Sequence, residues 1–270
     1  MTIIRVFPRK TKATPDDELA FIGMPDLFPP HADEVHVSCV FTWDIEYAQK
    51  IARYWGKLYD TVKLGGPAFG DPGDEFTPGR YVKHGYTMTS RGCPNACSFC
   101  FVPKREGKLR LLKIKPGWDI LDNNLLACPR CHIEAVLSML NDQPKAARFT
   151  GGIEAARVED WFVQQLSTMR LKQLYMAYDR PSEKPVVERA AKMMVDAGLK
   201  RWQVGCYVLI GHEHDTVLAA IERLEWVKSL GITPFAMLYR DSTNTPHSKE
   251  WRQLQRTWCR PAAIFRKTTQ

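Results

Sequence analysis

The chain of 270 residues lacks any hydrophobic run long enough to cross a membrane. A spanning helix needs about 20 apolar residues, so we expect no membrane segment. The first residues, MTIIRVFPRKTK, also lack the apolar stretch of a secretory signal. No internal repeat or low-complexity tract is present. With 44% hydrophobic and 25% charged residues, these absences exclude a disordered chain and favour a folded cytoplasmic protein.

The sequence does contain eight cysteines, and three of them fall within one window of eight residues, at Cys93, Cys97 and Cys100. Eight cysteines in a short secreted chain would indicate a disulfide framework. In a longer chain without a secretory signal, clustered cysteines indicate metal or redox chemistry instead.

The positive charge is distributed unevenly. The net charge is +8 for the whole chain, but residues 1–85 carry 10 basic and 12 acidic side chains, against 28 and 18 in residues 86–270. Two segments concentrate the excess, residues 104–115 and 249–270, each with six basic residues and one acidic residue. Solvated surface explains such runs equally well, but a patch for an anionic partner fits the segment that follows the cysteines.

The order of predicted elements favours an α/β fold. Strands at 35–41 and 62–65 around a helix at 45–55 predict a small βαβ unit in residues 1–85, which we interpret as an N-terminal extension. After Gly85, six strands are expected at 86–89, 120–127, 147–150, 173–178, 202–210 and 233–239. Helices are expected between them at 130–140, 155–169, 183–197 and 216–230. This alternation predicts a parallel sheet, in a curved partial barrel or an open doubly wound sheet, with the site at the carboxyl ends of the strands. We therefore divide the chain into the extension 1–85, a core 86–240 and a basic C-terminal tail 241–270.

The cysteine spacing C-x3-C-x2-C suits an iron–sulfur cluster. Three thiolates leave one iron of a four-iron cluster open to a small-molecule ligand. A structural zinc site usually has four protein ligands, and Cys128 and Cys131 could complete one. The same two cysteines could instead bind an auxiliary cluster or have no ligand role.

The segment Cys93-x3-Cys97-x-Phe99-Cys100 resembles the signature of the radical S-adenosylmethionine (radical SAM) superfamily. Gly151-Gly152-Ile153-Glu154 resembles the Gly-Gly-Glu motif of that superfamily, interrupted by Ile153, and residues 204–215 resemble its fifth-strand motif. The resemblance covers about residues 86–240 and implies a partial (β/α)6 barrel.

The resemblance also implies the chemistry. Cys93, Cys97 and Cys100 would bind a [4Fe-4S] cluster whose fourth iron takes S-adenosylmethionine. Reductive cleavage would then yield a 5′-deoxyadenosyl radical that abstracts a substrate hydrogen. The residues expected to contact S-adenosylmethionine are Phe99, Gly151, Gly152, Glu154, Asp179, Ser182, Ile210 and Gly211, with Arg180 as a further candidate for its carboxylate. Ordinary loop packing for Phe99, a helix cap for Ser182 and core packing for Ile210 are the structural alternatives.

Polar residues inside an otherwise apolar strand are costly unless they are paired. Asp122, Asn123 and Asn124 in the second strand are therefore candidate substrate contacts, and Tyr239 and Arg240 at the end of the sixth strand are further candidates. We interpret His212 and His214 as a polar loop rather than a metal site.

Residues 1–85 loosely resemble the remnant of a cobalamin-binding domain, but the D-x-H-x-x-G loop of that family is absent, so no cobalamin is expected. About 30 residues follow Arg240, which leaves no room for the added domain of methylthiotransferases and disfavours that reaction.

The net charge of residues 86–270 favours an anionic substrate. We expect a nucleotide or nucleic-acid base, in DNA or RNA, since compact radical SAM proteins occur among phage systems that hypermodify DNA bases; the location would then be the host cytoplasm. No second cofactor site is evident, which favours an isomerisation. Flavodoxin or ferredoxin would donate the electron. The alternatives are a radical SAM enzyme acting on a peptide or small metabolite, and a non-enzymatic, zinc-stabilised nucleic-acid-binding protein.

Overall fold

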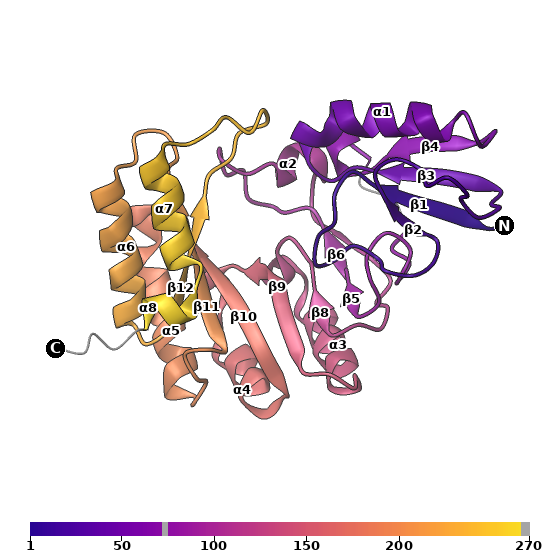
Figure 1. The fold of residues 1–270 in the computed structure, drawn as a ribbon. Helices are drawn as coiled ribbons and strands as arrows, with labels where there is room; N and C mark the ends of the chain where they lie inside the picture. Colours follow the sequence, from indigo (N-terminus) through magenta and orange to yellow (C-terminus); the bar gives the residue numbers. More distant parts are fainter. Residues whose placement is uncertain (72–74, 266–270) are drawn as a thin grey trace. The chain divides into compact units, whose positions relative to one another are not determined.

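The computed structural model describes residues 1–71 and 75–265, and the chain forms two compact units (Figure 1). Unit 1 comprises residues 1–117 with 242–244, and unit 2 comprises residues 118–241 with 245–270. The structure therefore divides later in the chain than the change in charge at Gly85. Within its described residues, the chain has no helix both long and apolar enough to cross a membrane.

Unit 1 begins with a four-stranded parallel sheet in the order β2-β1-β3-β4. The strands are β1 (Ile3–Phe7), β2 (Ala20–Ile22), β3 (Glu34–Ser38) and β4 (Val62–Gly65), and α1 (Ile45–Trp55) crosses between β3 and β4. The predicted βαβ unit is confirmed, and its helix has the expected bounds. The strands β1 and β2 were not predicted, because frequent proline and glycine made the first residues look irregular.

A hydrophobic core of its own makes this sheet more than an extension. Ile4, Val6, Val37, Ile51 and Trp55 are all at most 1% exposed. The indole nitrogen of Trp55 donates to the carbonyl of Gly23 at 3.1 Å. Burial of such side chains stabilises a fold by about 1.5–3 kcal/mol each, so the first 65 residues contribute their own stability.

The rest of unit 1 carries the cysteine loop. It contains β5 (Tyr86–Thr87), β6 (Ser90–Arg91), α2 (Val102–Arg105) and β7 (Arg110–Leu111), together with two short 3₁₀ helices earlier in the chain, Thr42–Asp44 and Pro67–Phe69. Of the strand expected at 86–89, only Tyr86–Thr87 is a strand, and a second short strand begins just after the predicted range at Ser90.

Unit 2 contains a parallel sheet in which β12, β11, β10, β9 and β8 are neighbours in that order. Its strands are β8 (Asp119–Ile120), β9 (Ala147–Ile153), β10 (Leu171–Tyr178), β11 (Val204–Ile210) and β12 (Thr233–Leu238). The connecting helices are α3 (Arg130–Asn141), α4 (Asp160–Thr168), α5 (Lys184–Asp196) and α6 (Val217–Ser229), followed by α7 (Lys249–Trp258) and α8 (Pro261–Ile264). The predicted α/β class with a parallel sheet is confirmed.

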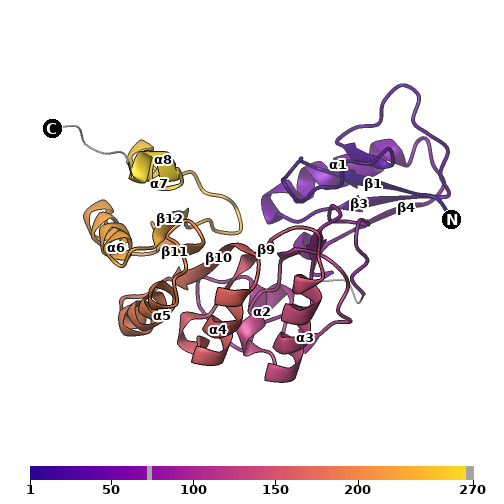
Figure 2. The same cartoon turned by 90° about the horizontal axis from the view of Figure 1, so that it is seen from below.

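The strands of unit 2 follow one another in chain order, without the reversal of a doubly wound sheet. Right-handed crossovers that always advance in one direction place all their helices on the same face. Figure 2 shows α3, α4, α5 and α6 along one side of the strands. Phe149 on β9 contacts Phe162 on α4, and Tyr178 on β10 contacts Trp226 on α6, so these strand residues mark the face that the helices cover.

Local chemistry explains the helix ends. The hydroxyl of Thr216 accepts a hydrogen bond from the amide of Ala219 at 3.2 Å and starts α6. The expected stop at Gly198 is confirmed, because that residue has a φ of +85° after α5.

Three predictions differ from the structure in part. The strand expected at 120–127 ends at Ile120, and Leu125–Ala127 form a 3₁₀ helix, because the polar residues between them leave the sheet. The helix expected at 155–169 is a 3₁₀ turn, Ala155–Arg157, followed by α4. The segment expected to be a basic tail contains α7 and α8, and α7 buries Leu254 and Trp258; residues 266–270 of that segment lie outside the described residues.

Candidate functional site

The cysteine loop is closed at its base by a short ladder and a buried ion pair. Ser90 pairs with Leu111 and Arg91 with Arg110 across the antiparallel strands β6 and β7. The guanidinium of Arg91 donates from Nε to Glu106 Oε2 at 2.9 Å and from Nη2 to Glu106 Oε1. Both side chains are buried. A bidentate pair of this kind holds two points of a loop in one geometry, so the segment between them is anchored at both ends.

Gly92 allows the chain to enter the loop. Its φ is +82°, and a Cβ built there would lie 2.2 Å from the carbonyl oxygen of Lys108. The next amide, that of Cys93, faces the carbonyl of Gly107 at 3.4 Å. Only glycine fits such a close backbone approach with a positive φ. The sequence analysis gave Gly92 no role, although its place immediately before the first cysteine was a usable signal.

Backbone amides point at two of the three cysteine sulfurs. The Asn95 amide lies 3.5 Å from the Sγ of Cys93, and the Val102 amide lies 3.5 Å from the Sγ of Cys100. Cys97 and Cys100 are joined by a turn, in which the Cys100 amide donates to the Cys97 carbonyl at 3.1 Å. Amide hydrogen bonds to cysteine sulfur are one of the means by which proteins tune iron–sulfur clusters. Thiolate chemistry and these two amide contacts suit such a cluster.

The three cysteines and Phe99 are half-buried. Among residues 1–71 and 75–265, no three His, Cys, Asp or Glu side chains are already gathered in the manner of a metal site. The two other cysteines considered as ligands, Cys128 and Cys131, belong to unit 2, where Cys128 is buried and Cys131 is exposed at the start of α3.

The strand ends of unit 2 gather most of the other predicted residues at one edge. Because β8 to β12 are parallel neighbours, their carboxyl ends meet at the same side of the sheet. The predicted residues at or just after these ends are Asp122, Asn123, Asn124, Gly151, Gly152, Glu154, Asp179, Ile210, Gly211, Tyr239 and Arg240. Ser182 lies further on, exposed in a 3₁₀ turn before α5.

Gly151 and Gly152 lie within β9, not after it as expected. A Cβ on Gly151 would be 2.1 Å from the carbonyl oxygen of Asp122, and Gly152 has a φ of +93°. Gly151 is thus required because the backbone of the segment after β8 lies too close to leave room for a side chain. Asp122 is 1% exposed, so the two strand ends are tightly packed.

Glu154 is held by two donors. Nδ2 of Asn124 and Nε of Arg157 each donate to Oε2 of Glu154 at 2.7 Å. Asn124 is 5% exposed. This contact joins two residues that the sequence analysis assigned separately, Asn124 to substrate and Glu154 to S-adenosylmethionine.

Asp179 at the end of β10 is an unusual carboxyl group. Burial, followed by the nearby charge of Glu183, raises the pKa of Asp179 to about 7. Its backbone amide donates to Oε2 of Glu183 at 2.8 Å. A carboxyl group with such a pKa changes charge near neutral pH and is a candidate for a functional role.

The loop after β11 depends on an ion pair that the sequence analysis missed. Asp215 accepts from the amide of Gly211 at 2.8 Å and from Nη2 of Arg223 on α6 at 2.7 Å. Ile210 is fully buried, as the core-packing alternative expected. The rings of His212 and Tyr239 meet edge to face, 4.5 Å apart, and Arg240 is exposed.

A row of aromatic rings crosses the face of the sheet opposite the helices. Tyr175 stacks on Tyr207 with ring centres 4.3 Å apart, and Phe235 meets Tyr207 edge to face at 5.5 Å. The hydroxyl of Tyr207 donates to the carbonyl of Thr150 at 3.2 Å. Burial raises the pKa of Tyr207. The row was not predicted, because it depends on the register of three strands.

Next to this row lies a buried carboxyl group. The hydroxyl of Thr150 donates to Asp119, and Nη1 of Arg148 lies 3.8 Å from Oδ2 of Asp119. Burial raises the pKa of Asp119. Polar side chains thus occupy this face of β8 and β9 as well.

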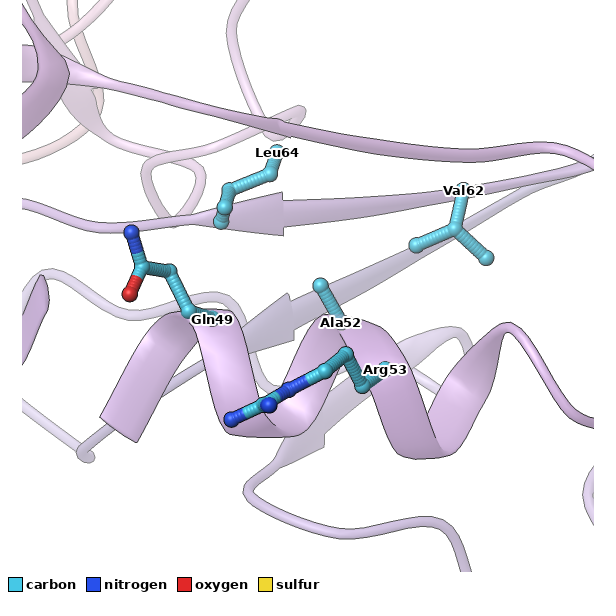
Figure 3. Close-up of a pocket in the computed structure, with 5 residues that line it drawn as sticks. All are labelled: Gln49, Ala52, Arg53, Val62 and Leu64. Atoms are coloured by element: carbon cyan, nitrogen blue, oxygen red, sulfur yellow. The ribbon is translucent and has the colours of Figure 1, made fainter. Parts of the chain in front are cut away.

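Unit 1 has a hollow of about 460 Å³ between α1 and β4, shown in Figure 3. Gln49, Ala52, Arg53, Val62 and Leu64 line it. None of the predicted site residues is among them, and the sequence analysis assigned this segment no ligand.

The comparisons with known proteins add no family. No protein-family model matches the chain, and no curated protein matches its sequence.

Proposed function

We propose that the protein is a radical SAM enzyme. The observation that carries this proposal is the cysteine loop: three cysteines in the radical SAM spacing, two of their sulfurs facing backbone amides, on a loop closed by the buried Arg91–Glu106 pair. In the proposal, Cys93, Cys97 and Cys100 hold a [4Fe-4S] cluster, and S-adenosylmethionine is the second cofactor. When bound, these groups would supply one-electron cleavage of the sulfonium and a 5′-deoxyadenosyl radical for hydrogen abstraction.

The chain's own residues would bind and orient S-adenosylmethionine. The proposal takes the sheet of unit 2 as the wall of a partial barrel, which its strictly sequential strand order supports. Gly151 and Gly152 present backbone without side chains, and Glu154, fixed by Asn124 and Arg157, presents a carboxylate to an amino group. Asp179, Gly211 and the ring of Phe99 complete the proposed cofactor contacts, with Ser182 and the backbone of Ile210.

The proposed substrate is a nucleotide or nucleic-acid base, altered by isomerisation or another modification. The supporting observation is the charge of +10 on residues 86–270 (28 basic minus 18 acidic). Asp122, Asn123, Asn124, Tyr239 and Arg240 remain the proposed substrate contacts. A flavodoxin or ferredoxin in the cytoplasm would supply the electron.

Anaerobic reconstitution with iron and sulfide tests the proposal. With dithionite and S-adenosylmethionine, the protein should release 5′-deoxyadenosine, measured by liquid chromatography and mass spectrometry. Cys97→Ala should abolish the release, because it removes one cluster ligand. The matched control is Ser98→Ala, the exposed neighbour in the same loop, which should retain activity.

Two results would contradict the proposal. One is a wild-type protein that binds about one zinc, without iron or an absorbance near 400 nm. The other is 5′-deoxyadenosine release that persists undiminished in Cys97→Ala. Peptide or metabolite turnover without any turnover of nucleic acid or nucleotide would keep the radical chemistry and change only the substrate.

A further inference from the structure

The described part of the C-terminal segment carries its positive charge on one side of α7. Lys249, Arg252 and Arg256 occupy positions i, i+3 and i+7 of this helix, and all three are exposed. Residues at such spacing share one helix face. Arg260 follows directly after the helix and is also exposed. We refer to Lys249, Arg252 and Arg256 as the α7 basic stripe.

The opposite side of α7 fixes the stripe in place. Leu254 and Trp258 are buried, and α7 packs on β12 and beside α6. Nζ of Lys228 on α6 lies 5.7 Å from the ring centre of Trp258. After the helix, the thiol of Cys259 donates to the carbonyl of Ala236 on β12 at 3.3 Å. The stripe therefore belongs to a seated helix and not to a loose tail (Figure 1).

The stripe has no acidic partner within the described residues, although Nε of Arg252 donates to the carbonyl of Ser248 at 3.4 Å. In the part of the chain that the structure describes, no acidic side chain forms an ion pair with Lys249, Arg252 or Arg256. Lys249 is the first residue of α7, where the positive end of the helix dipole disfavours a cation. Helix stability thus does not explain that lysine.

The other basic run differs in this respect. Arg105 lies over the ring of Phe101 at 4.8 Å, Arg110 donates to the carbonyl of Glu106 at 3.1 Å, and Lys115 lies 3.7 Å from Glu75. Half of the six cations in residues 104–115 therefore have partners inside unit 1. Of the three stripe cations, Arg252 alone has such a contact among the described residues, to the carbonyl of Ser248 one turn earlier.

We propose that the α7 basic stripe binds the phosphate backbone of a nucleic acid. Seven residues of helix advance about 10 Å at 1.5 Å per residue. One strand of DNA carries a charge about every 3.4 Å of axis, so three cations can face about three successive phosphates. Such contacts position a protein without selecting sequence.

A lipid surface fits the same helix less well. A helix that lies on a membrane inserts an apolar face between the lipids, and the apolar side of α7 is already buried in the protein. A free nucleotide would not need three cations distributed along 10 Å. The inference rests on the proposed function, which supplies the link between this binding surface and the substrate. It makes that substrate a polymer rather than a free nucleotide.

The test measures binding of the full-length protein to a fluorescent 20-base-pair DNA duplex and to the matching single strands of DNA and RNA. Fluorescence anisotropy reports the binding, at KCl concentrations from 50 to 200 mM. Lys249→Gln/Arg252→Gln/Arg256→Gln should weaken binding to at least one of them at least tenfold. The slope of log K against log[KCl] should fall by about 2.7 for a duplex or about 2.1 for a single strand, at 0.9 or 0.7 per phosphate.

The matched control is Lys50→Gln/Arg53→Gln/Lys57→Gln. These three exposed cations have the same spacing and the same total charge, but they lie on or just after α1 in the segment 1–85, where acidic residues outnumber basic ones 12 to 10. The control should retain wild-type binding. The single variant Arg256→Gln should lower the slope by about one third as much as the triple variant, and circular dichroism should show an unchanged fold for all of them.

The proposal is overturned by an absence of nucleic-acid binding at 50 mM KCl, by equal losses in the stripe and control variants, or by binding of the stripe only to vesicles of phosphatidylcholine and phosphatidylserine. Neither cluster nor S-adenosylmethionine is needed for this measurement. A wild-type protein that releases 5′-deoxyadenosine but does not bind nucleic acid would therefore reject the stripe alone. A protein that binds through the stripe but releases no 5′-deoxyadenosine would reject the radical chemistry alone.

Discussion

At the scale of single residues, glycines at close backbone approaches define the predicted sites. Gly92 introduces the cysteine loop, and Gly151 lets the segment after β8 reach β9. In both, the atom that an added Cβ would meet is a backbone oxygen, which cannot move aside as a flexible side chain can.

Gly92→Ala should destabilise the protein by about 2 kcal/mol or more, because it combines a positive φ with a clash against the carbonyl of Lys108. Gly107→Ala is the matched control, since Gly107 has a φ of +72° but no atom within 4 Å of an added Cβ. It should lose only about 1 kcal/mol. Urea unfolding measures both, and equal losses would show that the approach of Lys108 is unimportant.

Ionisation of Asp179 should change the free energy of unfolding with pH. Its pKa is raised in the folded protein to about 7, from the ordinary value of 3.8 for an aspartate. The folded state then binds more protons than the unfolded state between these two values, so stability should fall as the pH rises from about 4 to about 7. The slope from this one group is at most about 1.4 kcal/mol per pH unit.

Asp179→Asn should remove that slope and raise the melting temperature at pH 8, while changing it little at pH 4.5. Glu188→Gln, at an exposed carboxylate on α5, should leave the pH profile as in the wild type. Thermal unfolding across this pH range measures the effect; an unchanged profile in Asp179→Asn would show that the carboxyl group ionises normally.

At the scale of elements, the loop between β6 and β7 owes its closure to Arg91 and Glu106. These two residues are 15 positions apart in the sequence, too far for a local turn, but their side chains form a buried ion pair. Removal of one partner leaves the other charge buried and alone, which costs about 3–5 kcal/mol.

Arg91→Met and Glu106→Leu should each lower the free energy of unfolding by about 3–5 kcal/mol, whereas the double variant should recover much of the loss, since no charge is then buried without a partner. The exposed pair of Arg130 and Glu134 on α3 serves as the control and should contribute at most about 0.5 kcal/mol. Additive losses from the two buried variants in urea unfolding would show that the pair is not coupled.

The prediction of elements succeeded where periodicity is local. The helix α1 and the strand β4 match their predicted bounds because each has a clear apolar pattern and glycine at its end. It failed for α7, whose buried Leu254 and Trp258 are few among many polar residues. It also failed for 120–127, where apolar residues pack in a 3₁₀ turn after the strand has ended.

At the scale of the whole molecule, the eight cysteines are divided between the two units. The three of the loop lie in unit 1 with Cys39, and the other four lie in unit 2. Burial raises the pKa of Cys39 and of Cys259 to about 11, so these two are poor thiolate ligands.

Cys128→Ala/Cys131→Ser should leave the iron content of the reconstituted protein unchanged, at about four per chain if one cluster is bound, because the proposed ligands are the three cysteines of the loop. Cys93→Ala should lower it by most of that amount. Iron and sulfide analysis decides the matter; equal losses in both variants would favour a site completed by Cys128 and Cys131.

The sequence by itself determined the parallel α/β class, most of the helices and strands, and the three-cysteine spacing, because each of these depends on residues within one segment. Only the tertiary structure decided the rest. Tyr175, Tyr207 and Phe235 form one row because three strands share a register. The Arg91–Glu106 pair exists because β6 and β7 pair. The charges of Lys249, Arg252 and Arg256 became a defined surface because α7 buries its other face. In each of these cases the position of a side chain is set by packing against residues distant in sequence, which local patterns do not specify.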